Sequence, residues 1–150
     1  MLSDTHAALA LNGPRARDIL AATTDAPLGN ADFPWMSLKT ITIAGVETWA
    51  FRMSYAGELG WELHLPRNGA LAVYKALWSA GDPLGLADYG SFAMNAMRME
   101  KGFKGAGELT NEVTLPEADV MRFVKMDKAF LGRDATSKSA RNPMPGVCSY

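Results

Sequence analysis

The sequence has very little of what disulfide frameworks and metal sites need. Cys148 is the only cysteine among 150 residues, and His6 and His64 are the only histidines. A lone cysteine cannot pair within the chain, and two histidines without cysteines beside them do not make a set of metal ligands. The composition excludes a disulfide scaffold and predicts no metal site. It also favours a reducing compartment, so we expect a cytoplasmic location.

The sequence also lacks an excess of charge of one sign and a long apolar run. Lysine and arginine together number 15 and the acids 16, which gives a formal net charge of −1. A surface for nucleic acid or anionic lipid would show as a basic excess. A membrane span would need roughly 20 consecutive apolar residues. We therefore expect no nucleic-acid partner and no membrane partner, and a small ligand fits better.

The residues that are present predict one α+β domain, in which helices pack on an antiparallel β-sheet. With 48% hydrophobic residues, a chain of this length can bury a sizeable core. Alternating apolar residues predict strands over 38–43, 46–53 and 61–65. Helical periodicity and start signals predict helices over 14–24, 69–80, 91–100 and 127–140. The helix from Ser91 has almost no polar face and is expected to be buried. Phe33, Trp35 and Met36 are expected to cover an edge of the core.

The most informative stretch is the connection from Arg52 to Pro66, which holds a turn, two glycines and an acid between apolar runs. Gly57 and Gly60 would let this turn take positive φ without a Cβ clash. Strict alternation after the turn puts Trp61 on one face of the strand and Glu62 on the other. The pattern predicts a hairpin with a polar face, and periodicity alone allows that this face simply meets water.

Four motifs give the chain a resemblance to a known family. They are Arg-x-Ser-Tyr-x-Gly-Glu-Leu-Gly-Trp-Glu-Leu at 52–63, the Gly-Pro helix start within 11–20, the Phe-Pro segment at 31–36, and Arg-x-Glu-Lys-Gly within 93–102. Their order and spacing over residues 5–136 resemble the aminomethyltransferases, or glycine-cleavage T-proteins. The resemblance is strongest to the folate-binding module of dimethylglycine and sarcosine dehydrogenases. It implies a partial domain of this kind over 1–140, and a tail or the start of a further domain over 141–150.

The resemblance implies tetrahydrofolate as the cofactor and one-carbon transfer as the parent reaction, from a small amine or methylated donor. The family's pterin-binding residues fall on Glu62 and Tyr55. Arg98 is a third candidate for the ligand site, with an internal hydrogen bond or ion pair as an equal alternative. Glu58 is expected to be a solvated turn acid. FAD would belong to a domain that is absent from this sequence.

Two departures from the family leave the enzymatic activity of this chain open. The family's catalytic carboxylate comes earlier in the domain, so no residue here can be assigned to catalysis, and we expect the domain to be truncated at both ends. Residues 114–119 read Thr-Leu-Pro-Glu-Ala-Asp, which puts Asp119 where the family has glycine. Uncovered apolar surface would then make the isolated chain a homo-oligomer.

Two alternatives share the same fold. One is a non-catalytic folate-binding regulator or assembly factor, but such relatives carry Lys-Gly-Cys where this chain has Lys101-Gly102-Phe103. The other is a T-protein-like demethylase of small methylated compounds.

Overall fold

The computed structural model describes residues 2–141, which form two compact units divided after Lys101. The expectation of one domain through residue 140 stays a prediction, and the predicted tail lies outside the described residues except for Arg141.

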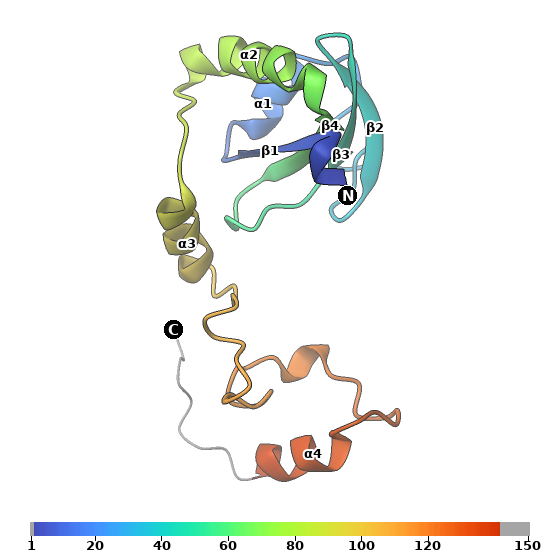
Figure 1. Ribbon diagram of the computed structural model, residues 1–150, viewed down its shortest axis with the longest axis vertical. Helices are drawn as coiled ribbons and strands as arrows, with labels where there is room; N and C mark the ends of the chain where they lie inside the picture. The colour runs from blue at the N-terminus through green and yellow to red at the C-terminus, as the bar shows by residue number, and fades with distance from the viewer. Residues whose placement is uncertain (1, 142–150) are drawn as a thin grey trace. The chain divides into compact units, whose positions relative to one another are not determined.

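The first unit is built on a four-stranded antiparallel sheet (Figure 1). Its strands are β1 (His6–Asn12), β2 (Leu38–Ile43), β3 (Val46–Phe51) and β4 (Gly60–Pro66), in the order β1-β4-β3-β2. The three predicted strands and the α+β class are confirmed. β1 was not predicted, because its alanine-rich sequence gives a weak strand signal.

Two turns set the register of this sheet. Ala44 and Gly45 join β2 to β3 with φ values of 49° and 76°, as a two-residue hairpin turn requires. Between β3 and β4, Gly57 has a φ of 75°, as expected. Gly60 does not take a positive φ, which corrects the expectation. It is needed for close approach instead, since a Cβ there would lie 2.8 Å from the backbone oxygen of Leu11 on β1.

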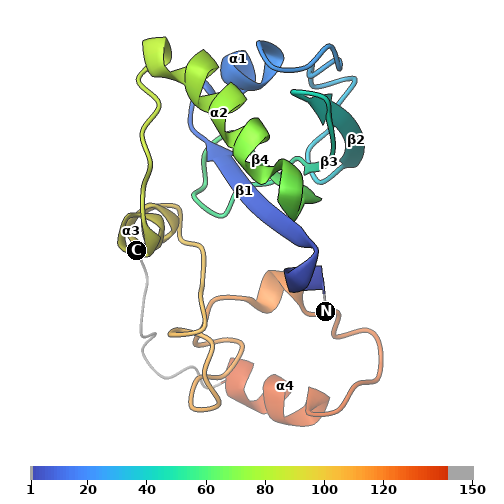
Figure 2. The same cartoon turned by 45° about the horizontal axis from the view of Figure 1, so that its top comes forward.

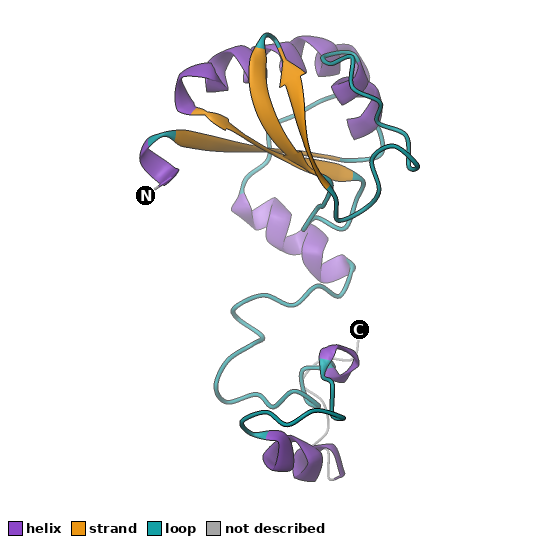
Figure 3. Ribbon diagram, turned by 90° about the vertical axis from the view of Figure 1, so that its right-hand side faces the viewer, coloured by secondary structure: helices purple, strands orange, loops and turns teal. Residues whose placement is uncertain are grey.

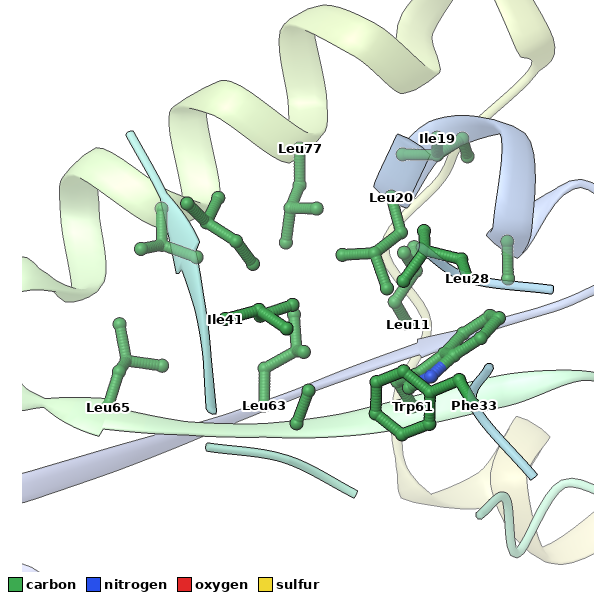
Figure 4. Close-up of a cluster of buried hydrophobic side chains, with 14 residues drawn as sticks. Leu11, Ile19, Leu20, Leu28, Phe33, Ile41, Trp61, Leu63, Leu65 and Leu77 are labelled. Carbon is green, nitrogen blue, oxygen red and sulfur yellow. The ribbon is translucent and has the colours of Figure 1, made fainter. Parts of the chain in front are cut away.

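Helices α1 (Ala16–Ala21) and α2 (Ala70–Gly81) cover one face of the sheet (Figure 3). Both helices match predictions, although α1 is shorter at each end than the predicted 14–24. Short 3₁₀ turns lie at Leu2–Asp4, Arg67–Gly69 and Asp82–Leu84. The helices and the sheet enclose one core (Figure 4), made of Leu11, Ala16, Ile19, Leu20, Leu28, Phe33, Ile41, Ile43, Ala50, Trp61, Leu63, Leu65, Val73 and Leu77.

The connection between α1 and β2 is only partly inside this core. Phe33 is fully buried and meets the edge of the Trp61 ring, with 6.1 Å between the ring centroids. Trp35 and Met36 are 73% and 51% exposed, so the expectation that they cover the core was wrong. Met36 has a φ of 63°, and its backbone continues the β2–β3 ladder through a hydrogen bond to the oxygen of Arg52.

Helix α3 (Ser91–Glu100) forms where predicted but is not buried. Its Phe92 is 93% exposed, and Arg98 is the one buried residue of the helix. The apolar composition indicated a buried helix, but none of its residues belongs to the core cluster of the first unit. The helix therefore presents apolar side chains to solvent.

The second unit consists mainly of turns, with a 3₁₀ turn at Met121–Phe123 and helix α4 (Arg133–Arg141). The predicted helix over 127–140 begins later than expected, directly after Gly132, whose φ is 86°. The backbone N–H and the hydroxyl of Thr114 both donate to Glu117. Asp119 has a φ of 55°, a conformation that glycine adopts more easily, so the departure from the family pattern falls on a left-handed position.

Candidate functional site

Strand β4 carries one buried face and one polar face. Trp61, Leu63 and Leu65 are buried, whereas Glu62 and His64 are partly exposed. The predicted separation of Glu62 from Trp61 is confirmed. The Glu62 Oε2 atom lies 3.4 Å from the His64 Nε2 atom, and both side chains are about two-fifths exposed. The polar face thus offers a carboxylate with two acceptor oxygens and an imidazole beside it.

The cross-strand neighbours of Glu62 differ in size on its two sides. Across the sheet, Glu62 pairs with Ala10 of β1 and with Phe51 of β3. Ala10 is exposed, and its small side chain rises little above the sheet beside Glu62. Farther along the same face, the rings of His6 and Trp49 stack at 5.5 Å between centroids. This face therefore presents the Glu62 carboxylate, the small side chain of Ala10 and the stacked rings of His6 and Trp49.

The turn before β4 places Tyr55 near the surface and fixes Glu58. Tyr55 is 38% exposed, while Ala56 beside it is buried. Glu58 Oε1 lies 3.2 Å from Lys101 Nζ, so Glu58 is ion-paired as well as half-exposed. The side chain of Lys101 lies against Gly57, and a Cβ at Gly57 would overlap it. The end of α3 therefore packs against this turn.

Arg98 is buried within the first unit, at 6% exposure. Its Nε and Nη2 atoms both donate to Asn95 Oδ1, at 3.0 and 2.6 Å. A neutral amide thus orients the guanidinium from the same helix. Tyr55, Glu62 and Arg98, the three predicted ligand residues, all belong to the β3–β4 hairpin and the helix whose end contacts it.

A cavity of about 790 Å³ lies between β1, α1, α2, α3 and the segment leading to α3, and its lining includes Ala10, the cross-strand neighbour of Glu62. These elements can be followed in Figure 2. The walls of the cavity are mostly apolar, with polar groups at a few points. Asn12 donates to the Tyr89 hydroxyl, and Tyr74 donates to Asp88 at 2.8 Å. The lining includes none of the three predicted ligand residues.

Neither a metal site nor a membrane helix is found among residues 2–141. No three His, Cys, Asp or Glu side chains come together as metal ligands there. No helix within that range has the length and apolar character to cross a bilayer.

Sequence reasoning missed two features of the first unit. One is the Asn12–Tyr89 hydrogen bond, which joins β1 to the segment before α3 across 77 positions. The other is the convergence of Arg17 and Arg52 on Asn30. Arg52 stands in the hairpin motif, but nothing in the sequence places Arg17 beside it.

Comparisons with known proteins connect this geometry to a family. A profile described as the GCVT N-terminal domain matches residues 1–128. Human mitochondrial dimethylglycine dehydrogenase is 37% identical over 137 residues, which cover 89% of this chain and 16% of that protein. Mitochondrial sarcosine dehydrogenase of Mus musculus is 38% identical over 133 residues, which cover 87% of this chain and 14% of that protein. The aminomethyltransferase of Halothermothrix orenii is 40% identical over 138 residues, covering 91% and 38%.

A solved structure shares the fold. A chain of the heterotetrameric sarcosine oxidase from Corynebacterium sp. U-96 superposes with a TM-score of 0.51 at 22% sequence identity, covering 59% of this chain and 44% of that one. The present chain spans about a sixth of the length of the dehydrogenases and over a third of the aminomethyltransferases. From the profile that covers most of its length, together with these relatives, the chain belongs to the GCVT N-terminal domain family.

Proposed function

We propose that this chain is a tetrahydrofolate-binding module for one-carbon transfer. The observation that carries the proposal is the Glu62 carboxylate, which stands on the polar face of β4 within the 52–63 motif that resembles this family. Its relatives include an aminomethyltransferase and two dehydrogenases of N-methylated amino acids. Their names support a role in handling one-carbon units, and folate is the carrier that the motif implies.

The chemistry of Glu62 suits the edge of a pterin ring. That edge presents a ring N–H beside an exocyclic amine, and these two parallel donors match the two oxygens of a carboxylate. Ala10 and Phe51, the cross-strand neighbours of Glu62, would lie beneath and beside the ring. Tyr55 would supply a further aromatic face or a hydroxyl, because its side chain is partly exposed.

Arg98 is the third proposed contributor. Asn95 holds its guanidinium at two nitrogen atoms, which would pre-orient it toward an anionic part of the ligand. An Arg98→Lys variant keeps the charge but loses the fork, so weaker binding at unchanged stability would support a ligand contact. A loss of stability with unchanged binding would assign Arg98 to the structure alone.

The test is calorimetric titration with 5-formyltetrahydrofolate, a stable reduced folate. Glu62→Ala should weaken binding by about 1.5 to 3 kcal/mol, because it removes a charge-assisted bidentate contact. That loss corresponds to a dissociation constant roughly 10 to 150 times higher. Glu58→Ala is the matched control, since Glu58 lies in the same hairpin at similar exposure but is paired with Lys101. Equal losses for the two variants, or no binding by the unmodified chain, would contradict the proposal.

A second part of the proposal concerns association. Phe92 of α3 is almost fully exposed, and Met99 of the same helix is 40% exposed. We propose that the isolated chain forms homo-oligomers through such apolar side chains. Sedimentation should show a dimer or larger species that Phe92→Ser converts to monomer. A wild-type monomer at high concentration would contradict this.

A further inference from the structure

Two arginines from distant segments converge on Trp61 and Asn30. Arg17 belongs to α1, and Arg52 directly follows β3. Their guanidinium carbons lie 6.0 and 5.9 Å from the centre of the Trp61 ring. Both side chains donate from Nη2 to the same atom, Asn30 Oδ1, at 2.7 and 2.8 Å. The two nitrogens can therefore be no farther apart than the sum of these distances.

No ion pair within residues 2–141 balances the positive charge of this pair. No ion pair joins Arg17 or Arg52 to an acid anywhere in residues 2–141, and Asp18, the acid next to Arg17, is paired with Arg15 at 2.6 Å. A third cation belongs to the same set of contacts, because Lys39 Nζ lies 5.5 Å from the ring centre of Phe33, which contacts Trp61. Burial first, and then the charge of Arg17, lowers the pKa of Arg52.

Most of the donors of this pair have no acceptor among residues 2–141. A guanidinium carries five N–H groups. Arg52 donates to the Phe33 oxygen and to Asn30, and Arg17 donates only to Asn30. The Nε atoms of both arginines and the Nε1 atom of Trp61 are buried without an acceptor. The single amide oxygen that both share carries no charge, so it aligns the two forks without neutralising them.

We propose that Arg17 and Arg52 form a binding site for an oxyanion, either a carboxylate or a phosphoryl group, with Lys39 adding to its positive field. Guanidinium forks match both groups, because each presents oxygens that accept pairs of N–H bonds. Cation–π contact with the Trp61 ring, at about 6 Å from its centre, also restrains both groups. The site lies on the core side of the sheet end, whereas Glu62 faces the other side, so it does not depend on the proposed folate site.

The alternative is that the two arginines only hold the loop containing Asn30 and Phe33. One substitution distinguishes the two roles. Asn30→Asp changes one atom and places a carboxylate between the two guanidinium groups. If the site is built for an oxyanion, this internal anion raises the melting temperature by a few degrees and removes the response to added anions. If the arginines only hold the loop, the unmodified chain gives no anion response for Asn30→Asp to remove.

The experiment titrates the full chain with sodium phosphate and, separately, with sodium glutarate, at an ionic strength held constant with sodium chloride. Binding is followed through the ¹⁵N–¹H signals of the arginine Nε groups and through the melting temperature. We expect a saturable shift of the Arg17 and Arg52 signals, and the tighter of the two anions identifies the ligand class. Arg17→Gln should weaken that binding at least tenfold.

Arg15→Gln is the matched control, since Arg15 precedes α1 and already has Asp18 as its partner. It should bind the anion as the unmodified chain does. The proposal is overturned if neither anion gives a saturable shift, or if Arg17→Gln and Arg15→Gln respond equally. It is also overturned if Asn30→Asp leaves anion binding intact.

Discussion

Replacing Gly57 with alanine should detach the end of α3 from the β3–β4 hairpin. Two separate costs fall on this position. Alanine at a φ of 75° costs about 1 kcal/mol. Its Cβ would also overlap Cγ of Lys101 and lie 2.7 Å from Cβ of the same residue. Because a Cβ atom moves only with its backbone, the helix end must shift, and such overpacking typically costs about 1 to 3 kcal/mol.

Two other glycines separate these costs. Gly45 has a φ of 76°, and nothing lies within 4 Å of the methyl group that alanine would add, so Gly45→Ala measures the dihedral cost alone. Gly60 has no positive φ but faces the backbone of β1, so Gly60→Ala measures a steric cost alone. Each change also gains about 0.4 to 1 kcal/mol from the unfolded chain. Gly57→Ala should therefore cost about 1 to 3 kcal/mol more than Gly45→Ala.

Urea denaturation followed by tryptophan fluorescence can measure this difference. All four tryptophans lie before residue 102, so the signal reports on the first unit. Lys101→Ala should restore part of the extra loss in the double variant, because it removes the Cγ and Cδ atoms of Lys101 near the new methyl group but leaves its Cβ in place. The reasoning is refuted if Gly57→Ala costs no more than Gly45→Ala. It is also refuted if Lys101→Ala gives no recovery.

Three further predictions concern turns. Ala44→Asn should stabilise the first unit by about 0.5 kcal/mol, because asparagine tolerates the left-handed φ of a two-residue turn; an unchanged urea midpoint would contradict this. Asp119→Gly should slow proteolysis of the second unit, because glycine adopts the φ of 55° at this position more easily than aspartate does. Faster cleavage of the variant would contradict this. The pKa of Glu117 is lowered from 4.5, first by the Thr114 hydroxyl and then by its N–H. The stabilisation that these hydrogen bonds give the folded state is present above pH 4.5 and is lost as the pH falls through the lowered pKa. An NMR titration of the Thr114→Val variant should therefore find the pKa of Glu117 closer to 4.5.

The parts of the fold that sequence reasoning predicted are those whose signal is local. The alternation from Trp61 to Leu65 fixes which side of β4 is buried, and Ala44-Gly45 specifies a tight turn without outside help. The hairpin and the face that carries Glu62 therefore followed from neighbouring residues.

The features that were missed or wrong depend on contacts between distant segments. β1 is a strand because it pairs with β4, although its alanines have weak strand propensity. Gly60 serves the approach of Leu11 and has no role in its own turn geometry. The burial of α3 could not be judged from its composition, because composition says what a helix would gain by burial and does not reveal whether a surface is there to cover it.

The same limit applies to the candidate sites. Glu62 and Tyr55 stand in one continuous motif, so the sequence alone could propose them together. Arg17 and Arg52 meet only because α1 and the end of β3 flank the same tryptophan. No periodicity links two such positions.

The strand order also determines the order in which the sheet can assemble. β2, β3 and β4 follow one another in the chain and pair as neighbours, so they need only short loops to close. Pairing β1 with β4 closes a loop of residues 13–59. Because closing a long loop costs entropy before the contact forms, this pairing should be the slow, non-local step of folding. As an outer strand bonded on one side, β1 is also the segment that should open first. Native-state hydrogen exchange should therefore release the amides of β1 before those of β3.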